Sequence, residues 1–135
     1  MADHIHAHGV LQVRFTVSNV DRAVKFYTDI LGFKKLMDLN QGAFLSNGSV
    51  GLGIGPRPAP DRPIANDHFD ENRVGLDHLS FAVPSRAALD EAVRVLDKHG
   101  IAHSEIMDLG EALGICILVF RDPDNMLLEV AAPRR

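Results

Sequence analysis

Apolar and polar residues alternate in the same way in two stretches of the chain. The first reads VLQVRFTV over residues 10–17, and the second reads GLDHLSFAV over residues 75–83. Successive side chains of a strand point to opposite faces, so each stretch predicts a strand with one apolar and one polar face. When Gln12 is aligned with His78, the apolar positions of the two stretches coincide. The chain therefore repeats one strand pattern, with a different polar residue near the start of each copy.

A helix pattern follows each of these strands. Apolar residues recur with helical spacing between Ser18 and Gly32, and again between Ser85 and Gly100. The two serines are predicted N-caps, Ser18 with an acidic residue three positions later, and the two glycines can end the helices. Three short β-like runs follow in each half, and DPDN at residues 122–125 has the composition of a tight turn. The order strand, helix and three strands occurs twice, which predicts two packed copies of one βαβββ unit and an α+β fold.

These patterns divide the chain into four segments. Residues 1–9 are predicted to be a flexible tail, residues 10–56 the first module and residues 75–133 the second module. Residues 57–74 lie between the modules. Four of the seven prolines occur between Gly55 and Asn72, which favours a stiff linker, and a lid or pocket wall is the alternative.

The composition narrows the classes of protein. A chain of 135 residues can form one compact domain or two small modules. The net charge of −4 argues against a nucleic-acid or anionic-membrane partner, because both favour a basic face. No apolar run is long enough to span a bilayer, and the amino end lacks the pattern of a secretion signal, so a cytoplasmic location is expected. Cys116 lies in the apolar run GICILVF, which predicts a buried, inert thiol.

The polar faces of the two repeated strands carry the first candidate residues. In the first strand the apolar side chains should meet the helix, so Gln12 and Arg14 point the other way. In the second strand the same argument places His78 and Ser80 on the polar face. We expect the two polar faces to line one concave surface.

Glu129 is a further unusual residue, because it lies between apolar neighbours in the run LLEVAA. Burying a carboxylate is costly unless it is paired or bound to a metal. When the last strands of the two halves are aligned by matching Pro56 with Pro133, Leu52 takes the position of Glu129. Leucine neither binds a metal nor moves a proton, so the two modules are expected to contribute unequally.

The repeated βαβββ pattern and the segments VSNVDRAVKFYTDILGF and RDPDNMLLEV resemble the vicinal oxygen chelate superfamily. That superfamily includes glyoxalase I, extradiol dioxygenases, fosfomycin-resistance transferases and bleomycin-resistance binding proteins. The resemblance covers about residues 10–133. It implies two modules that form one curved, cup-shaped mixed sheet, with a divalent metal at the bottom of the cup. It also implies that the ligands come from the start of the first strand and the end of the last strand of each module.

Carried over by position, these ligand slots are Gln12, Leu52, His78 and Glu129. Without a ligand at Leu52, the implied set of Gln12, His78 and Glu129 suits Fe, Mn, Ni, Co or Zn and leaves open positions for a substrate with adjacent oxygens. A neutral amide oxygen binds metal more weakly than an imidazole, so weak metal retention is expected. Beside this site, Arg14 can hold a substrate carboxylate, and Ser80 is the other expected substrate contact.

The resemblance leaves more than one function open. A metal-dependent enzyme of the lyase or dioxygenase type is favoured, without an assigned catalytic residue, although the missing carboxylate at Leu52 argues against a standard glyoxalase I. The alternative is a metal-free small-molecule binding or resistance protein, in which Arg14 could pair with Glu129. An isomerase or epimerase would need a carboxylate base, for which Asp77 and Glu111 are the nearest candidates. Members of the superfamily commonly pair, so a homodimer is expected.

The remaining histidines carry weaker signals. His99 and His103 flank a glycine near a helix end and are expected to be a surface cap and a solvated residue, while His68 lies in the long loop. The tail contains an alternating cluster that could bind metal adventitiously in an assay, formed by His4, His6 and His8.

Overall fold

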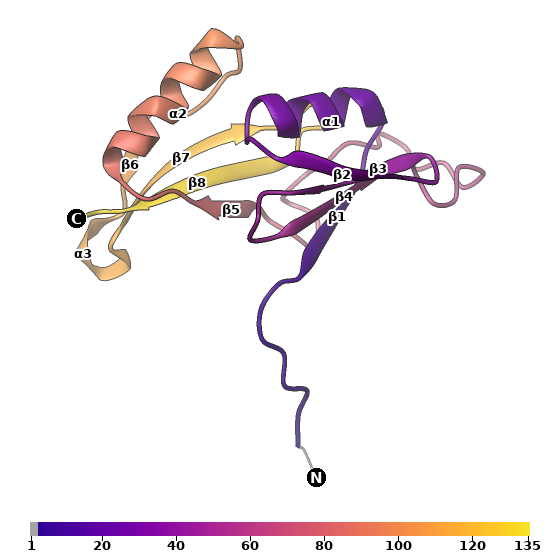
Figure 1. Ribbon diagram of the computed structural model, residues 1–135, viewed down its shortest axis with the longest axis horizontal. Coiled ribbons are helices and arrows are strands. Elements are labelled where there is room, and N and C mark those ends of the chain that lie inside the picture. The colour runs from indigo at the N-terminus through magenta and orange to yellow at the C-terminus, as the bar shows by residue number, and fades with distance from the viewer. Residues whose placement is uncertain (1–2) are drawn as a thin grey trace. The chain divides into compact units, whose positions relative to one another are not determined.

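The computed structural model describes residues 3–135, which form two compact units divided between Asp61 and Arg62 (Figure 1). The division falls inside the segment predicted to join the modules, residues 57–74. Each unit contains one four-stranded sheet that combines parallel and antiparallel pairs. The predicted α+β fold class is confirmed.

The first unit contains one helix and one sheet. Its elements are β1 (Gln12–Thr16), α1 (Val20–Asp29), β2 (Lys34–Leu39), β3 (Gly42–Ser46) and β4 (Gly51–Gly55). The strand order is β1-β4-β3-β2, with β1 parallel to β4 and the other pairs antiparallel. α1 packs against the sheet and buries Ala23 and Tyr27, both at predicted apolar positions of the helix.

The second unit repeats this topology with one addition. Its elements are β5 (Leu79–Ala82), α2 (Arg86–Lys98), β6 (Met107–Asp108), α3 (Gly110–Leu113), β7 (Ile115–Arg121) and β8 (Leu127–Pro133). The strand order is β5-β8-β7-β6, and β5 is parallel to β8. The run IAHSEIMDL, the first of the three short β-like runs expected after the second helix, forms only the two-residue β6 and an isolated bridge between His103 and Phe120. The short helix α3 lies between β6 and β7 in the chain.

The helix starts agree with the sequence in one unit and differ by one residue in the other. The Ser85 side chain caps α2, as predicted, by accepting a backbone N–H at 3.2 Å. The predicted cap Ser18 is wrong, because Asn19 caps α1 and accepts the Arg22 N–H at 3.0 Å. Both residue types are good caps, and Asn19 has the extended backbone that is typical of an N-cap. Positive φ angles follow both helices, at Gly32 and Gly100.

The registers of the two sheets identify equivalent positions in the units. Arg14 lies opposite Gly53 in the β1–β4 pair, and Ser80 lies opposite Glu129 in the β5–β8 pair. Because Arg14 and Ser80 occupy the same position of the repeated strand, Gly53 is the counterpart of Glu129. The alignment that gave this position to Leu52 is wrong by one residue. A shift of one residue changes the face of the sheet, and Leu52 lies in the core with 1% of its surface exposed.

The turns before the last strands use one chemical device in both units. Asn47 Oδ1 accepts the N–H groups of Ser49 and Val50, each at 2.9 Å. The carboxylate of Asp122, in the predicted DPDN turn, accepts two N–H groups at 2.9 Å in the same way. This shared Asx turn supports the view that the units are copies of one pattern.

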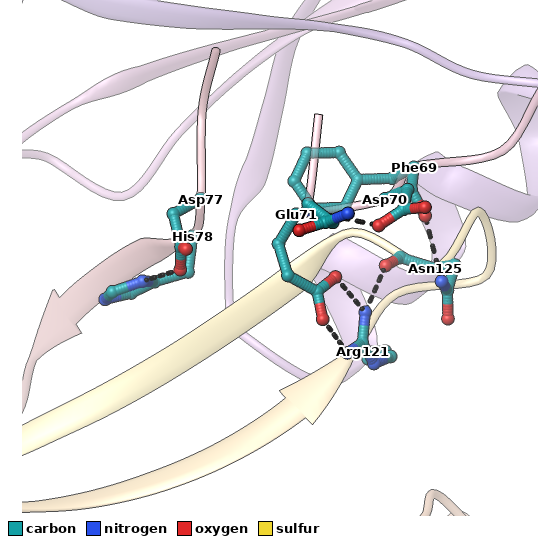
Figure 2. Close-up of polar contacts among 8 residues, drawn as sticks. Phe69, Asp70, Glu71, Asp77, His78, Arg121 and Asn125 are labelled. Carbon is teal, nitrogen blue, oxygen red and sulfur yellow. Dashed lines mark hydrogen bonds and ion pairs between the residues drawn. The ribbon is translucent and has the colours of Figure 1, made fainter. Parts of the chain in front are cut away.

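The end of the segment between the two sheets is bound to the second unit. Arg121 on β7 donates two hydrogen bonds to Glu71, from Nη1 to Oε2 at 2.9 Å and from Nη2 to Oε1 at 2.6 Å (Figure 2). The Asn125 side chain donates to the Phe69 carbonyl at 2.9 Å. Hydrogen bonding from Arg121 lowers the pKa of Glu71 to about 2. We call residues 69–72 the anchored segment; whether residues 57–74 act as a linker or a lid stays a prediction.

The core of the first unit confirms the predicted apolar face of its first strand, whereas Leu79 and Phe81 of the second repeated strand are only half-buried. Phe15 and Val17 of the first repeated strand are buried, whereas Gln12, Arg14 and Thr16 are exposed. The thiol of Cys116 is also buried, as predicted. In each unit the polar side chains of the first strand therefore lie on the face of the sheet that points away from the helix.

Candidate metal centre

In the second unit, three of the predicted site residues lie together beside the central strand β8. Glu129 on this strand is 9% exposed and lies between β5 and β7. Ser80 Oγ donates a hydrogen bond to Glu129 Oε1 at 2.8 Å. His78 Nε2 lies 3.5 Å from Glu129 Oε2. A nearly buried carboxylate therefore has one oxygen engaged by a hydroxyl and the other facing an imidazole.

Asp77 adds a second carboxylate to this group. Its Oδ1 lies 2.7 Å from Nδ1 of His78, as Figure 2 shows. The side chain of His78 is 40% exposed and that of Asp77 is 69% exposed. His78 is thus flanked by Asp77 on one nitrogen and by Glu129 on the other. From the sequence, Asp77 was expected only as a candidate base. The signal for its contact with His78 was the adjacent Asp-His pair at the start of a strand.

In the first unit, Gln12 and Arg14 lie on the exposed face of β1. Gln12 lies opposite Gly51, and Arg14 lies opposite Gly53, on the parallel strand β4. The equivalent position in the second unit carries Glu129, so β4 has neither a ligand nor a base there. Gly53 also leaves open a space beside β1 that a leucine side chain at this position would fill.

The side chain of Arg14 fills part of that space. A Cβ atom at Gly53 would lie 3.2 Å from Arg14 Cγ and 3.3 Å from its Nη1, and one at Gly55 would lie 3.0 Å from its Cζ. The arginine therefore extends along β4 over positions that lack side chains. Among residues 3–135 its guanidinium has no ion-pair or hydrogen-bond partner. It is a cation with its hydrogen-bonding edge available to a ligand.

The donors of the second unit fit a divalent ion in part. Within residues 3–135, no group of three or more His, Cys, Asp and Glu side chains is arranged to hold a metal ion. His78 and Glu129 supply one imidazole nitrogen and one carboxylate oxygen, 3.5 Å apart. Two ligand atoms that share an ion at about 2.1 Å lie about 3.0–3.4 Å apart, so a small movement would bring both into reach of one ion. The third implied ligand, Gln12, belongs to the first unit, and its union with this pair stays a prediction.

Other titratable candidates have structural partners. Glu111 Oε1 lies 3.5 Å from Arg134 Nη1 and 3.3 Å from Arg135 Nη2, so its carboxylate is engaged by two cations. His99 is the C-cap residue of α2, as predicted. The expectation of a solvated His103 is wrong, because both of its ring nitrogens have partners: Nδ1 lies 2.6 Å from the Ser104 carbonyl oxygen and Nε2 lies 2.8 Å from Asp97 Oδ1.

The other histidines named from the sequence lie in the segment between the two sheets and in the tail. His68 is exposed in the segment between the two sheets. In the tail, the rings of His4 and His6 have centroids 4.3 Å apart.

Among the described residues no helix is long and apolar enough to cross a membrane.

Comparison with known proteins places the chain in a family. A model of the Glyoxalase/Bleomycin resistance protein/Dioxygenase superfamily matches residues 8–130, so the chain belongs to this superfamily. A metallothiol transferase FosB of Shouchella clausii is 28% identical over 123 residues, which are 91% of this chain and 79% of the transferase.

Solved structures agree with this assignment. A glyoxylase/bleomycin resistance protein/dioxygenase domain from Frankia sp. EAN1pec is 33% identical, with a TM-score of 0.77, and the match covers 96% of this chain and 100% of that domain. A lactoylglutathione lyase from Agrobacterium tumefaciens has a TM-score of 0.72 at 22% identity, over 93% of this chain and 94% of the lyase. The latter similarity concerns the fold alone.

Proposed function

We propose that the protein is a divalent-metal-dependent enzyme that acts on a small substrate with adjacent oxygens. The observation that supports this most directly is the convergence of His78 Nε2 and Glu129 Oε2 to 3.5 Å. Glu129 is nearly buried on a central strand, and a carboxylate retained there needs a partner that repays its desolvation. A metal ion shared with His78 is such a partner.

The proposed ligands are Gln12, His78 and Glu129, and the proposed metals are Fe, Mn, Ni, Co or Zn. When bound, a divalent ion supplies Lewis acidity toward oxygen atoms of the substrate. Gly53 at the fourth ligand slot leaves a coordination position without a protein ligand. It also removes the carboxylate that a reaction of the glyoxalase I type takes from this position, so a lyase of another type or a dioxygenase is favoured.

Arg14 is the proposed contact for an anionic group of the substrate. Its unpartnered guanidinium lies over a strand whose facing positions are glycines, so a planar carboxylate can approach its edge. The expected substrate contact of Ser80 also stays a proposal, and its hydroxyl proton is engaged by Glu129.

The second candidate function is a metal-free binding protein for a small molecule. One observation favours it: the separation of 3.5 Å between His78 and Glu129 is also that of an ordinary ion pair. In that case the two residues would form a polar floor of a binding pocket. A homodimer and a cytoplasmic location are further expectations for either function.

Bound metal distinguishes the two functions. The full chain with His4, His6 and His8 replaced by alanine is loaded separately with Fe, Mn, Ni, Co and Zn, and retained metal is measured by mass spectrometry. The enzyme proposal expects nearly one ion per chain, and expects its loss in Gln12→Ala, His78→Ala and Glu129→Ala. His99→Ala, which removes an imidazole elsewhere in the second unit, should keep the ion. Equal retention in all of these proteins would reject the metal centre and favour the binding protein.

A further inference from the structure

The two ring nitrogens of His78 have different surroundings. Nδ1 lies at hydrogen-bonding distance, 2.7 Å, from Asp77 Oδ1, whereas Nε2 lies 3.5 Å from Glu129 Oε2. An ionised carboxylate can only accept a hydrogen bond, so the short contact requires the proton on Nδ1. In a neutral imidazole the lone pair is then on Nε2. The nitrogen that carries the lone pair is the one that faces Glu129.

We propose that Asp77 is a positioning residue, which fixes the Nδ1–H tautomer of His78 and thereby presents Nε2 to a cation. This inference rests on the proposed function in taking that cation to be the divalent metal. Histidines that bind metals commonly donate their other N–H to a carboxylate, which sets the tautomer, holds the ring and raises the basicity of the ligand nitrogen. The 2.7 Å contact places Asp77 to set the tautomer of His78 and to hold its ring.

The chain around Asp77 supports such a role. Its neighbour His78 directly precedes β5, so the backbone on one side is held by the sheet. On the other side, the anchored segment is bound to the end of β7 through Glu71 and to the β7–β8 turn through Phe69 (Figure 2). The residues between these two attachments, including Asp77, are therefore restrained from both ends.

Ser80 engages one polar atom of Glu129, as Asp77 engages one ring nitrogen of His78. Its hydroxyl engages Oε1, which leaves Oε2 as the oxygen that faces the imidazole. Each proposed ligand thus has one polar atom bound to a neighbour and one polar atom directed at the other ligand. If Asp77 only added negative charge to the surface, no such arrangement of the polar atoms of His78 and Glu129 would be needed.

The tautomer can be measured directly and without metal. Nitrogen-15 NMR of histidine-labelled, metal-free protein at about pH 8.5, where an ordinary imidazole is neutral, distinguishes a protonated ring nitrogen from one with a lone pair. We expect His78 of the wild type to carry its proton on Nδ1. In Asp77→Asn the side-chain amide can donate to Nδ1, so we expect a substantial population with the proton on Nε2. Asp77→Ala should give a mixture of both forms.

Metal affinity provides the second readout. Titration with Mn, Co and Zn should show a dissociation constant raised about 10- to 100-fold in Asp77→Asn and Asp77→Ala. The matched control is Glu105→Gln, which removes one exposed negative charge from the same unit and should change neither readout. Because the Asp77 side chain is largely exposed, the variants are expected to fold, and circular dichroism checks this.

The two readouts separate the two proposals. A tautomer that stays the same in Asp77→Asn, or an unchanged affinity in a protein that binds metal, would overturn the role of Asp77. A wild-type protein that binds no metal, yet changes tautomer in Asp77→Asn, would keep Asp77 as the residue that orients His78 and would overturn the proposed function instead. An equal loss of affinity in Glu105→Gln would assign the effect to net charge and reject the positioning role.

Discussion

The Ser80 hydroxyl donates a 2.8 Å hydrogen bond to Oε1 of Glu129, a residue 49 positions later that lies directly opposite it on β8. The bond joins the first and last strands of the second unit on their polar face. It also supplies a donor to a carboxylate that is shielded from water. Loss of this donor should affect both the stability of the unit and the orientation of the carboxylate.

Replacement of Ser80 by alanine is expected to lower the free energy of unfolding by about 1–3 kcal/mol, because Oε1 of Glu129 is left without a donor. Urea denaturation at neutral pH measures this change. Ser49→Ala, at an exposed turn position of the first unit, is the control and should change stability by less than about 0.5 kcal/mol. Equal stability of Ser80→Ala and wild type would show that water satisfies Glu129 in solution.

Replacement by alanine should destabilise the protein at one glycine of the first unit and have little effect at another. At Gly42 a methyl group would meet the backbone of β4, 3.3 Å from the Ile54 carbonyl carbon and 3.2 Å from Gly55 Cα, so Gly42→Ala is expected to cost about 1–3 kcal/mol. At Gly55 the methyl group would meet only the end of the Arg14 side chain, which can move away. Denaturation of Gly55→Ala should therefore match wild type. A reversed order of the two variants would contradict the described packing of β3 on β4.

The ion pair of Glu71 with Arg121 predicts a change in stability at acid pH. The folded pKa of Glu71 is about 2, below its ordinary value of 4.5, so the stabilisation is present above pH 4.5 and is lost as the pH falls toward 2. The difference in melting temperature between wild type and Glu71→Gln should be largest above pH 4.5 and should shrink below it. A constant difference across this range would mean that the ionised carboxylate contributes nothing.

The contacts of His103 predict that stability falls as the pH rises, the opposite of the dependence expected for Glu71. Its pKa is raised, first by the hydrogen bond to the Ser104 carbonyl and then by the carboxylate of Asp97. The stabilisation is therefore complete below the ordinary histidine value of 6.5 and is lost as the pH rises through the raised pKa. The melting temperature of wild type should fall more than that of His103→Gln between pH 6 and 9. Parallel curves for the two proteins would show that the second proton of the ring is not retained.

Much of the fold could be predicted from the sequence because its strongest signals are periodic. The alternation in the strand that became β1 predicted the correct buried face, with Phe15 in the core and Gln12 exposed, while the apolar positions of β5 are half-buried. The helix caps were accurate to within one residue, since serine and asparagine are nearly equal as caps and stand next to each other at the start of α1.

The register of the last strands could not be obtained in the same way. Nothing in the sequence requires Pro56 and Pro133 to occupy the same position of the repeated strand. The pairing with the first strands makes Gly55 the counterpart of Ala131, so Pro56 corresponds to Ala132. A slip of one residue is invisible in composition, yet it exchanges a core leucine for a glycine on the polar face.

The candidate site was predictable in its residue types but not in its contacts. The burial of Glu129 follows from its apolar neighbours, whereas the hydrogen bond from Ser80 depends on the register and could not be read from the sequence. The pairing of Asp77 with His78 depends on side-chain conformation between adjacent residues, for which a sequence carries little information. The joining of Gln12 to His78 and Glu129 stays a prediction.

The anchored segment changes how the two units are tethered. Because Phe69 and Glu71 are bound to the second unit, the chain left to connect the two sheets is residues 56–68. Fully extended, this stretch spans at most about 45 Å. If this stretch is the predicted linker, its prolines make it a stiff spacer of restricted length and direction. The geometry of that spacer would then set the local concentration at which one unit meets another, in the same chain or in a neighbouring one.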